Sequence, residues 1–220
     1  MKFSKRIILA SASPRRKEIL SSMGLEFEVI PTDADESTGS AKRPAGLVKQ
    51  LSALKANALS ADMISANGLD GDGCIGADNS AGATEPNKNG LQSPTVIGAD
   101  TVVVFRGEVL GKPHSEENAV DMLKRMQGKW HSVYTGVTVK CADQSVCFSV
   151  RSRVKMRALS DEEILNYVKD AKPLDKAGAY GIQDGRVVQK YRGSYTNIVG
   201  LPKEKLAKVL AGLGIENGND

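Results

Sequence analysis

The residues best suited to chemistry begin with two adjacent arginines, Arg15 and Arg16, which follow three small residues and Pro14. Pro14 suits the first position of a helix because its missing N–H is not needed there, and Ser13 is then the expected N-cap. Cations at a helix N-terminus are unfavourable by about 0.3–1 kcal/mol. Together with the unbonded N–H groups of the first turn, two guanidinium groups form an anion site suited to phosphate. A pair of solvated arginines on a surface turn fits this stretch equally well.

A second chemical group is Asp100, which lies inside Thr95–Phe105, the strongest β-strand pattern in the chain. A carboxylate in such a β-branched run is desolvated unless a cation, a metal ion or hydrogen bonds compensate. We therefore expect Asp100 to be functional rather than a structural capping residue. A near copy of its Gly-Ala-Asp sequence ends at Asp78, but no strand pattern follows it, and we interpret that copy as a decoy.

Other charged residues become candidates for a functional site only if they lie near the groups described above. Lys55 lies at the edge of the apolar stripe of a helix that opens at Pro44, where a lysine is usually exposed. Gly107 predicts a turn between two strands, and if these pair, Lys112 returns to near the level of Asp100. An acidic cluster that includes Glu36 follows a short strand and fits either a solvated turn or a carboxylate that helps to hold a cation.

Strand and helix patterns follow one another along the chain. Strands are expected at 7–10, 27–30, 95–105, 109–110, 130–139 with a kink at Gly136, and 146–157; helices are expected after Pro14, Pro44, Ser115, Ser160 and Pro202, with Ser115 and Ser160 as caps and a hairpin turn at Asp184-Gly185. Residues 1–215 are expected to form either one sizeable domain or one two-lobed domain. A polar, glycine-rich insert at about 62–94 interrupts it, and a frayed tail at 216–220 follows.

The composition is that of an ordinary globular protein. The 220 residues are 40% hydrophobic and 25% charged, with a mean hydropathy of −0.27. Three cysteines without a CxxC motif and two distant histidines do not indicate a zinc site or a disulfide framework. No apolar run reaches membrane-spanning length, so we expect a cytoplasmic protein without a membrane partner.

The net charge of +4 suits an anionic substrate but is too small to indicate nucleic acid by itself. Residues 146–157 alternate between apolar and basic side chains, and the basic side could touch nucleic acid. No aromatic platform accompanies it in the sequence, so we interpret it as a solvated sheet face. We expect no nucleic-acid partner, and the oligomeric state stays open, with a homodimer as one option.

Five motifs, in order, resemble those of the Maf family of nucleoside triphosphate pyrophosphatases: SASPRR at 11–16, GADTVV at 98–103, GKP at 111–113, LDKAGAYGIQ at 174–183 and GSYTNIVGLP at 193–202. The resemblance implies an inosine-triphosphatase-like α/β fold, with a long curved mixed sheet, flanking helices and a nucleotide cleft between two lobes. It also implies hydrolysis of a nucleoside triphosphate to the monophosphate and pyrophosphate with Mg²⁺ or Mn²⁺, a house-cleaning activity on the nucleotide pool.

The same resemblance assigns roles to individual residues. Asp100 falls on the catalytic base of the family, and Arg15, Thr101 and Gln183 fall on positions associated with base selection. The combination Pro-Arg-Arg, Ala-Asp-Thr and Gly-Ile-Gln is similar to the branch that prefers dTTP and UTP. A Gln side chain offers a donor and an acceptor side by side, which matches the O4/N3 edge of a pyrimidine.

We therefore expect a metal-assisted attack of water on the α-phosphorus. Asp100 and Glu36 would hold the divalent ion, with Asp100 as base, metal ligand or both. The other expected substrate-binding residues are Ser11, Ser13, Arg15, Arg16, Lys55, Thr101, Lys112, Lys176 and Gln183. Asp175 either pairs with Lys176 to fix the lobe interface or reaches the site, and we favour the pairing.

The alternative is a nucleotide-binding regulator of septum formation without turnover, a process to which the family is also linked. Asp100 argues against pure binding, because a carboxylate beside a triphosphate weakens affinity unless a cation or the chemistry uses it.

Overall fold

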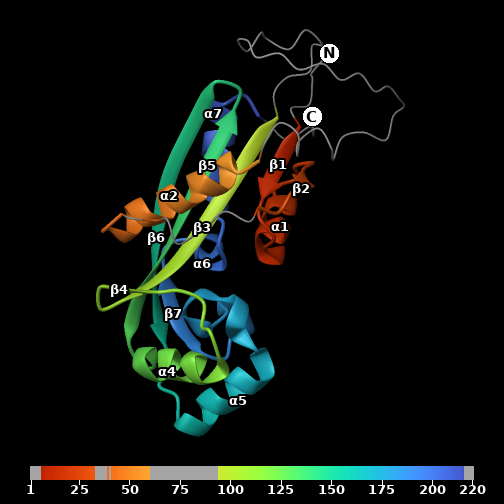
Figure 1. Ribbon diagram of the computed structural model, residues 1–220. Coiled ribbons are helices and arrows are strands. Elements are labelled where there is room, and N and C mark those ends of the chain that lie inside the picture. Colours follow the sequence, from red (N-terminus) through yellow and green to blue (C-terminus); the bar gives the residue numbers. More distant parts are fainter. Residues whose placement is uncertain (1–5, 33–38, 40, 60–93, 216–220) are drawn as a thin grey trace, which may run out of the picture.

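The computed structural model describes residues 6–32, 39, 41–59 and 94–215 (Figure 1). Glu36, Asp78, the predicted insert up to residue 93 and the predicted tail at 216–220 lie outside these described residues.

The strands and helices expected from the sequence are present in the described chain. The strands are β1 Ile7–Ala10, β2 Glu28–Val29, β3 Thr95–Phe105, β4 Glu108–Leu110, β5 Trp130–Cys141, β6 Gln144–Met156 and β7 Val188–Arg192. The helices are α1 Pro14–Ser21, α2 Pro44–Asn57, α4 Glu116–Met126, α5 Asp161–Ala171, α6 Tyr195–Val199 and α7 Lys203–Gly212, and three short 3₁₀ helices are η2 Pro173–Asp175, η3 Ala177–Ala179 and η4 Ile182–Asp184.

The described strands form one seven-stranded mixed sheet in the order β2-β1-β3-β5-β6-β7, and β4 pairs with β3 outside this path. β1 is parallel to both β2 and β3, and the other pairs are antiparallel. The long strands β3, β5 and β6 run through most of the molecule (Figure 1). The predicted α/β class with a mixed sheet and flanking helices is confirmed.

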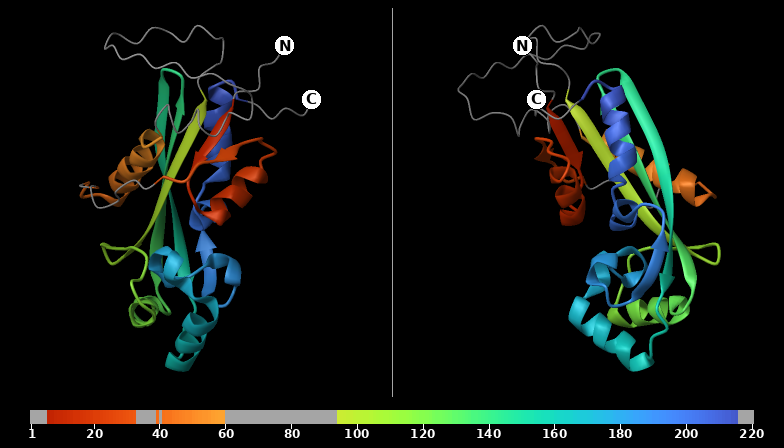
Figure 2. Two further views of the ribbon diagram at one scale, coloured as in Figure 1. Left: turned by 45° about the vertical axis from the view of Figure 1, so that its right-hand side comes forward. Right: turned by 180° about the vertical axis from the view of Figure 1, so that it is seen from behind.

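Helices cover both faces of the sheet beside β1 (Figure 2). Ile7 and Leu9 pack into a core with residues of α1 and α7, whereas Ile8 and Ala10 pack on the opposite face near the end of α2. This alternation explains the unbroken apolar run in the sequence, because both sets of side chains are buried. A third core, between the far end of the sheet and α4, α5 and the 3₁₀ helices, includes Leu123 and Ile164.

The predicted side-chain caps are present at two helices and absent at a third. The Ser115 hydroxyl accepts from the Asn118 N–H, and Ser160 forms the predicted capping box with Glu163. Ser13 occupies the N-cap position of α1, but its side chain makes no capping hydrogen bond. The hydroxyl of Ser11 accepts the Ser13 N–H instead, at 3.3 Å.

One of two predicted irregularities is wrong, and the other stays a prediction. The register of β5 with both neighbours continues unbroken through Gly136, which excludes a bulge there but does not test the predicted kink. A Cβ at Gly136 would lie 2.1 Å from the Val48 carbonyl oxygen. The absence of a side chain at Gly136 therefore lets α2 pack directly against the sheet. The Asp184-Gly185 turn does not join a hairpin, because residues 173–184 form 3₁₀ helices and β7 pairs with β6.

Candidate functional site

The candidate site lies where one edge of β3 lacks a neighbouring strand within the described chain. β1 pairs with β3 only as far as Gly98, and β4 begins to pair at Val103. Successive side chains of a strand point to opposite faces. Asp100 and Thr101 therefore approach this open edge from the two faces of the sheet. A pocket of about 600 Å³ opens there, a size typical of small-molecule sites.

Every predicted site residue that the structure describes lines this one pocket. These residues are Ser11, Ser13, Arg15, Arg16, Lys55, Asp100, Thr101, Lys112, Lys176 and Gln183. They come from the end of β1 and the start of α1, from α2 and β3, from the segment after β4, and from the 3₁₀ helices. Glu36 lies outside the described residues, so its place relative to the pocket stays a prediction.

Asp100 forms a buried ion pair with Lys55. The Lys55 Nζ lies 2.6 Å from the Asp100 Oδ1, and the two residues are 9% and 5% exposed. The expectation of an exposed Lys55 is therefore wrong. Gly98 explains the burial, because a Cβ there would lie 2.3 Å from the Ser52 carbonyl oxygen and would push α2 off the sheet. Each charge of the pair offsets the desolvation of the other.

Hydrogen bonds from three directions orient the guanidinium group of Arg16. Its Nε donates to the Gly200 carbonyl at 2.9 Å, and its Nη1 and Nη2 donate to the hydroxyls of Ser11 and Thr101, each at 3.1 Å. These acceptors come from β1, β3 and the end of α6, so parts of the chain far apart in sequence hold one side chain. Such fixed orientation favours directional binding of an anion.

The partners of Thr135 determine which hydroxyl donates in the hydrogen bond between Thr101 and Thr135. The Thr135 hydroxyl donates to the Asn197 carbonyl at 2.8 Å, which uses its single proton. Thr101, 3.0 Å from Thr135, must then donate to Thr135. The Thr101 oxygen is left to accept from Arg16 and has no proton for a ligand. Sequence reasoning missed Thr135, because only the strand register places it opposite Thr101.

A three-residue charge cluster joins α1 to η2. The Arg15 Nη1 and the Lys176 Nζ each lie 2.8 Å from a carboxylate oxygen of Asp175. Partial burial acts to raise the pKa of Asp175, but the hydrogen bonds from Lys176 and Arg15 outweigh it and hold that pKa below its ordinary value. The favoured pairing of Asp175 with Lys176 is confirmed, and Arg15 adds a link across the chain. Asp175 also lines the pocket, so the alternative that it reaches the site holds as well.

Comparison of this chain with known proteins shows the family to which it belongs. A family model described as Maf-like protein matches residues 6–213. The chain belongs to the Maf family. The resemblance drawn from its five motifs is thereby confirmed over nearly the whole chain.

Several relatives of this Maf chain carry one name. A protein of Thermosipho africanus named dTTP/UTP pyrophosphatase is 42% identical over 93% of this chain and 92% of its own length. Proteins with the same name from Agathobacter rectalis and Aquifex aeolicus are 40% and 39% identical, over 96% and 97% of this chain and 98% of their own lengths.

The pocket wall of this Maf chain also includes Tyr180, which sequence reasoning did not single out. Its hydroxyl lies 2.7 Å from the Nε2 of His131, a residue of β5 that is buried behind the wall. Burial lowers the pKa of His131 to about 4 and raises that of Tyr180. His131 is therefore neutral near pH 7, and its ring packs edge-on against Tyr180 as part of the support of the pocket.

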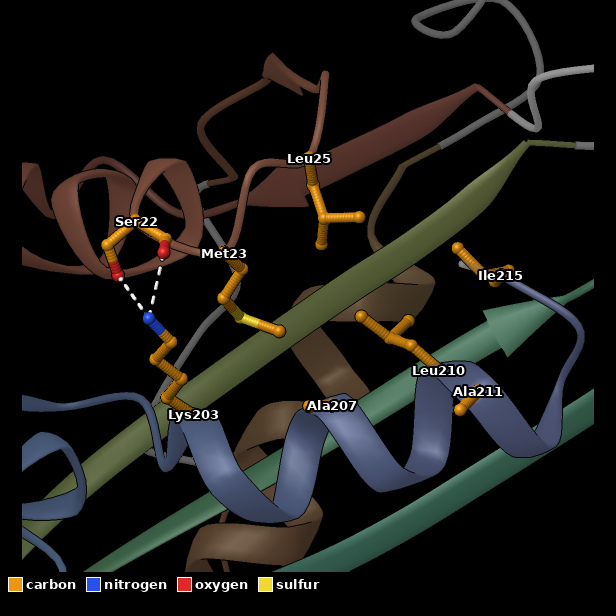
Figure 3. A pocket seen from close by; sticks show the side chains of 8 residues that line it. All are labelled: Ser22, Met23, Leu25, Lys203, Ala207, Leu210, Ala211 and Ile215. Carbon is orange, nitrogen blue, oxygen red and sulfur yellow. Dashed lines mark hydrogen bonds between the residues drawn. The ribbon is translucent and has the colours of Figure 1, made fainter. Parts of the chain in front are cut away.

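A second hollow, of about 360 Å³, lies between the end of α1 and α7 (Figure 3). Its lining is mainly apolar, with Met23, Leu25 and Leu210 among the side chains that face it. The Nζ of Lys203 is already bonded to the carbonyl and hydroxyl oxygens of Ser22, at 2.8 and 3.1 Å. No carboxylate is among its lining residues, so the pocket beside Asp100 is the better candidate for chemistry.

Proposed function

We propose that this Maf chain hydrolyses nucleoside triphosphates, with a preference for dTTP and UTP, to the monophosphate and pyrophosphate. The observation that carries the proposal is the single pocket that holds the Asp100–Lys55 pair and the oriented Arg16. A triphosphate carries about four negative charges near neutral pH, so its cleavage depends mainly on positioning and on charge neutralisation. The names of the relatives support the choice of substrate.

In this proposal the cations bind the phosphates. Arg15, Arg16, Lys112 and Lys176 line the pocket and lie on segments that surround the open edge of β3. Arg16 is the best oriented of these cations, because Gly200, Ser11 and Thr101 fix its plane. The Thr101 hydroxyl acts through Arg16 and does not donate to the base. This differs from the base-selecting position that the resemblance implied for Thr101.

Asp100 is the proposed base or metal ligand. Lys55 holds its carboxylate at 2.6 Å, and the carboxylate can orient a water or take its proton as the water attacks the α-phosphorus. The exposed side chain of Gln183 is the proposed contact to the pyrimidine, because an amide pairs a donor with an acceptor.

The donor set of the pocket fits a divalent ion of the Mg²⁺ or Mn²⁺ type. Such ions use one or two protein carboxylates, with water and substrate phosphates completing the coordination. Asp100 supplies one carboxylate, and Glu36 stays the proposed second ligand. When bound, the ion would neutralise phosphate charge and polarise a phosphoryl oxygen. Within the described residues no group of three or more His, Cys, Asp or Glu side chains is arranged to hold a metal ion without substrate.

The experiment that tests this function is pyrophosphate release over a panel of nucleoside triphosphates, with and without Mg²⁺ or Mn²⁺. We expect turnover that requires the metal and is highest for dTTP and UTP. Asp100→Asn should abolish turnover, whereas Asp121→Asn, which changes an exposed carboxylate of α4 outside the pocket, should not. Absence of turnover by the unaltered protein with every nucleotide would refute the proposal.

A further inference from the structure

The outer part of the sheet carries a cluster of positive charge that the strand register assembles. Residues directly opposite each other on β5, β6 and β7 share one face. That face collects Trp130 and Tyr134 from β5, Arg151, Arg153 and Lys155 from β6, and Lys190 and Arg192 from β7. We refer to these seven residues as the basic sheet face. None of them lines the nucleotide pocket.

Helix α2 covers the same face of the sheet farther along, at Gly136 (Figure 1). Beyond it, Arg151, Arg153, Lys190 and Arg192 are exposed to solvent. The other face of these strands is different, because it packs into the core with α4 and α5. The charges therefore lie on the solvent-exposed face of these strands, and the opposite face packs into the core.

The arrangement is unfavourable for the protein by itself. Arg153 lies directly opposite Arg192, and Lys155 lies directly opposite Lys190. Like charges in directly opposed positions destabilise a sheet. Unfavourable local arrangements of this kind are expected mainly at functional sites.

Carboxylates do not compensate these charges within the described chain. Arg151 bonds to the Ser132 hydroxyl, and Lys155 donates to the Gly128 carbonyl, both of which are neutral acceptors. Two exposed arginines elsewhere do have carboxylate partners, since Arg125 pairs with Glu108, and Arg186 with Asp170. The basic sheet face thus presents charge that lacks an anionic partner among the described residues.

The structure also supplies the aromatic side chains that the linear sequence did not show. Guanidinium carbons of Arg153 and Arg192 lie 5.0 and 5.4 Å from the centre of the Trp130 ring, and the Lys190 Nζ lies 6.0 Å from it. Arg151 lies 5.6 Å from the centre of Tyr134. The argument against nucleic acid rested on a missing aromatic platform, and cross-strand pairing removes that argument.

We propose that the basic sheet face binds a segment of single-stranded nucleic acid. Its phosphates would lie along the five cations, and its bases would displace the arginines that lie over the rings of Trp130 and Tyr134 and stack there, since aromatic rings beside a basic groove are the usual platform for single strands. A second copy of this chain fits less well, because it would bring the same positive charge. This interaction is independent of the nucleotide pocket.

Fluorescence anisotropy with a labelled 20-nucleotide oligo(dT) in EDTA tests the proposal. Chelation stops metal-dependent turnover, so only binding is measured. We expect the logarithm of the binding constant to fall linearly with the logarithm of the salt concentration. The double variant Arg153→Gln/Arg192→Gln should lower affinity at least tenfold at low salt and reduce the slope by about 1.4, at about 0.7 for each lost phosphate contact. Trp130→Leu should lower affinity with little change of slope.

A matched control is Arg125→Gln/Arg186→Gln, which removes two exposed, ion-paired arginines outside the basic sheet face. It should leave both affinity and slope unchanged. Both double variants should stay folded, as a cooperative melting transition would show, and should retain the pyrophosphate release of the unaltered protein, so failure of this proposal is distinct from failure of the proposed enzyme activity.

Three results would overturn the proposal. They are absence of binding by the unaltered protein at low salt, an equal loss of affinity in the control double variant, and equally tight binding of polyglutamate or of duplex DNA. The last result would assign the face to an acidic protein surface or to purely electrostatic contact with a duplex.

Discussion

Arg16 illustrates how neutral groups can prepare a charged one. Its bonded acceptors include a carbonyl and two hydroxyls, which orient the guanidinium group. Thr101 accepts from Arg16 and donates its proton to Thr135, whose own proton goes to the Asn197 carbonyl. Under the proposed function, phosphate binding at Arg16 would depend in part on Thr135, which does not itself line the pocket.

Replacing Arg16 tests the anion site directly. Arg16→Ala should lower kcat/KM for dTTP by on the order of 100-fold, as expected when one charged hydrogen-bonded contact of about 2–4 kcal/mol is lost. Steady-state kinetics with the preferred metal measure the effect. An unchanged kcat/KM would contradict the role of Arg16 in phosphate binding.

Thr135 is the proposed positioning residue behind Thr101. Thr135→Val removes the acceptor of the Thr101 proton, so Arg16 should lose its fixed orientation and kcat/KM should fall about tenfold. Thr135→Ser keeps the hydroxyl and should restore most of the activity. If the two variants lose equal activity, or if Thr135→Val lowers only the melting temperature, the hydroxyl does not act on the site.

Gln183 is the residue at which base preference is best tested. Gln183→Ala should change the ranking of dTTP and UTP against other nucleotides and should largely preserve the metal dependence, because the side chain is proposed to contact the base alone. A nucleotide panel for both proteins measures this. An unaltered ranking would count against Gln183 as the selecting residue.

Contact between α2 and the sheet decides the geometry of the site. Gly98 on β3 and Gly136 on β5 leave room for the backbone of α2, which lets Lys55 reach Asp100. The sequence pattern placed Lys55 on the edge of the helix but could not show how closely the helix approaches the sheet. Two glycines on different strands, rather than the helix itself, therefore explain the burial of the ion pair.

Adding a methyl group at Gly136 should separate these elements. In Gly136→Ala the Cβ would lie 2.1 Å from the Val48 carbonyl oxygen, and overpacking against a core typically costs about 1–3 kcal/mol of unfolding free energy. Denaturant unfolding should show the loss, together with reduced turnover. Gly212→Ala is the control, because a Cβ at this position in α7 meets no atom within 4 Å. Equal stability of the two variants would mean that α2 can shift away from the sheet at little cost in unfolding free energy, which would contradict the prediction.

Several long-range contacts hold the whole molecule together. Lys203, at the start of α7, bonds to Ser22 at the end of α1, and Arg15 bonds to Asp175 near η2. His131 and Tyr180 add a buried link between β5 and the pocket wall. None of the helices in the described part of the chain is long and apolar enough to cross a bilayer.

Buried His131 should make the stability of the whole molecule depend on pH. Its pKa is about 4 when folded because of burial, against an ordinary value of 6.5. As the pH falls from 6.5 to 4 the unfolded chain gains a proton that the folded chain does not, so the unfolding free energy should fall by up to about 3 kcal/mol.

Denaturant unfolding over this pH range measures the effect. His131→Gln should flatten this part of the profile, whereas His114→Gln, at the other and exposed histidine, should not. A profile that is equally steep in both variants would assign the pH dependence to other groups.

The sequence alone determined the features that depend on neighbouring residues and on an ordered set of motifs. The strand at 95–105, the double-sided burial of Ile7–Ala10, the caps at Ser115 and Ser160, and the family all follow from such patterns. Their physical basis is local, because side-chain period and capping act within a few residues.

Only the tertiary structure decided the features that need partners from distant segments. These are the burial of Lys55 against Asp100, the proton direction at Thr101, and the meeting of Trp130 with basic side chains of two other strands. The reason is that strand register and helix-to-sheet distance set these contacts, and neither quantity can be read from the spacing of residues along one segment.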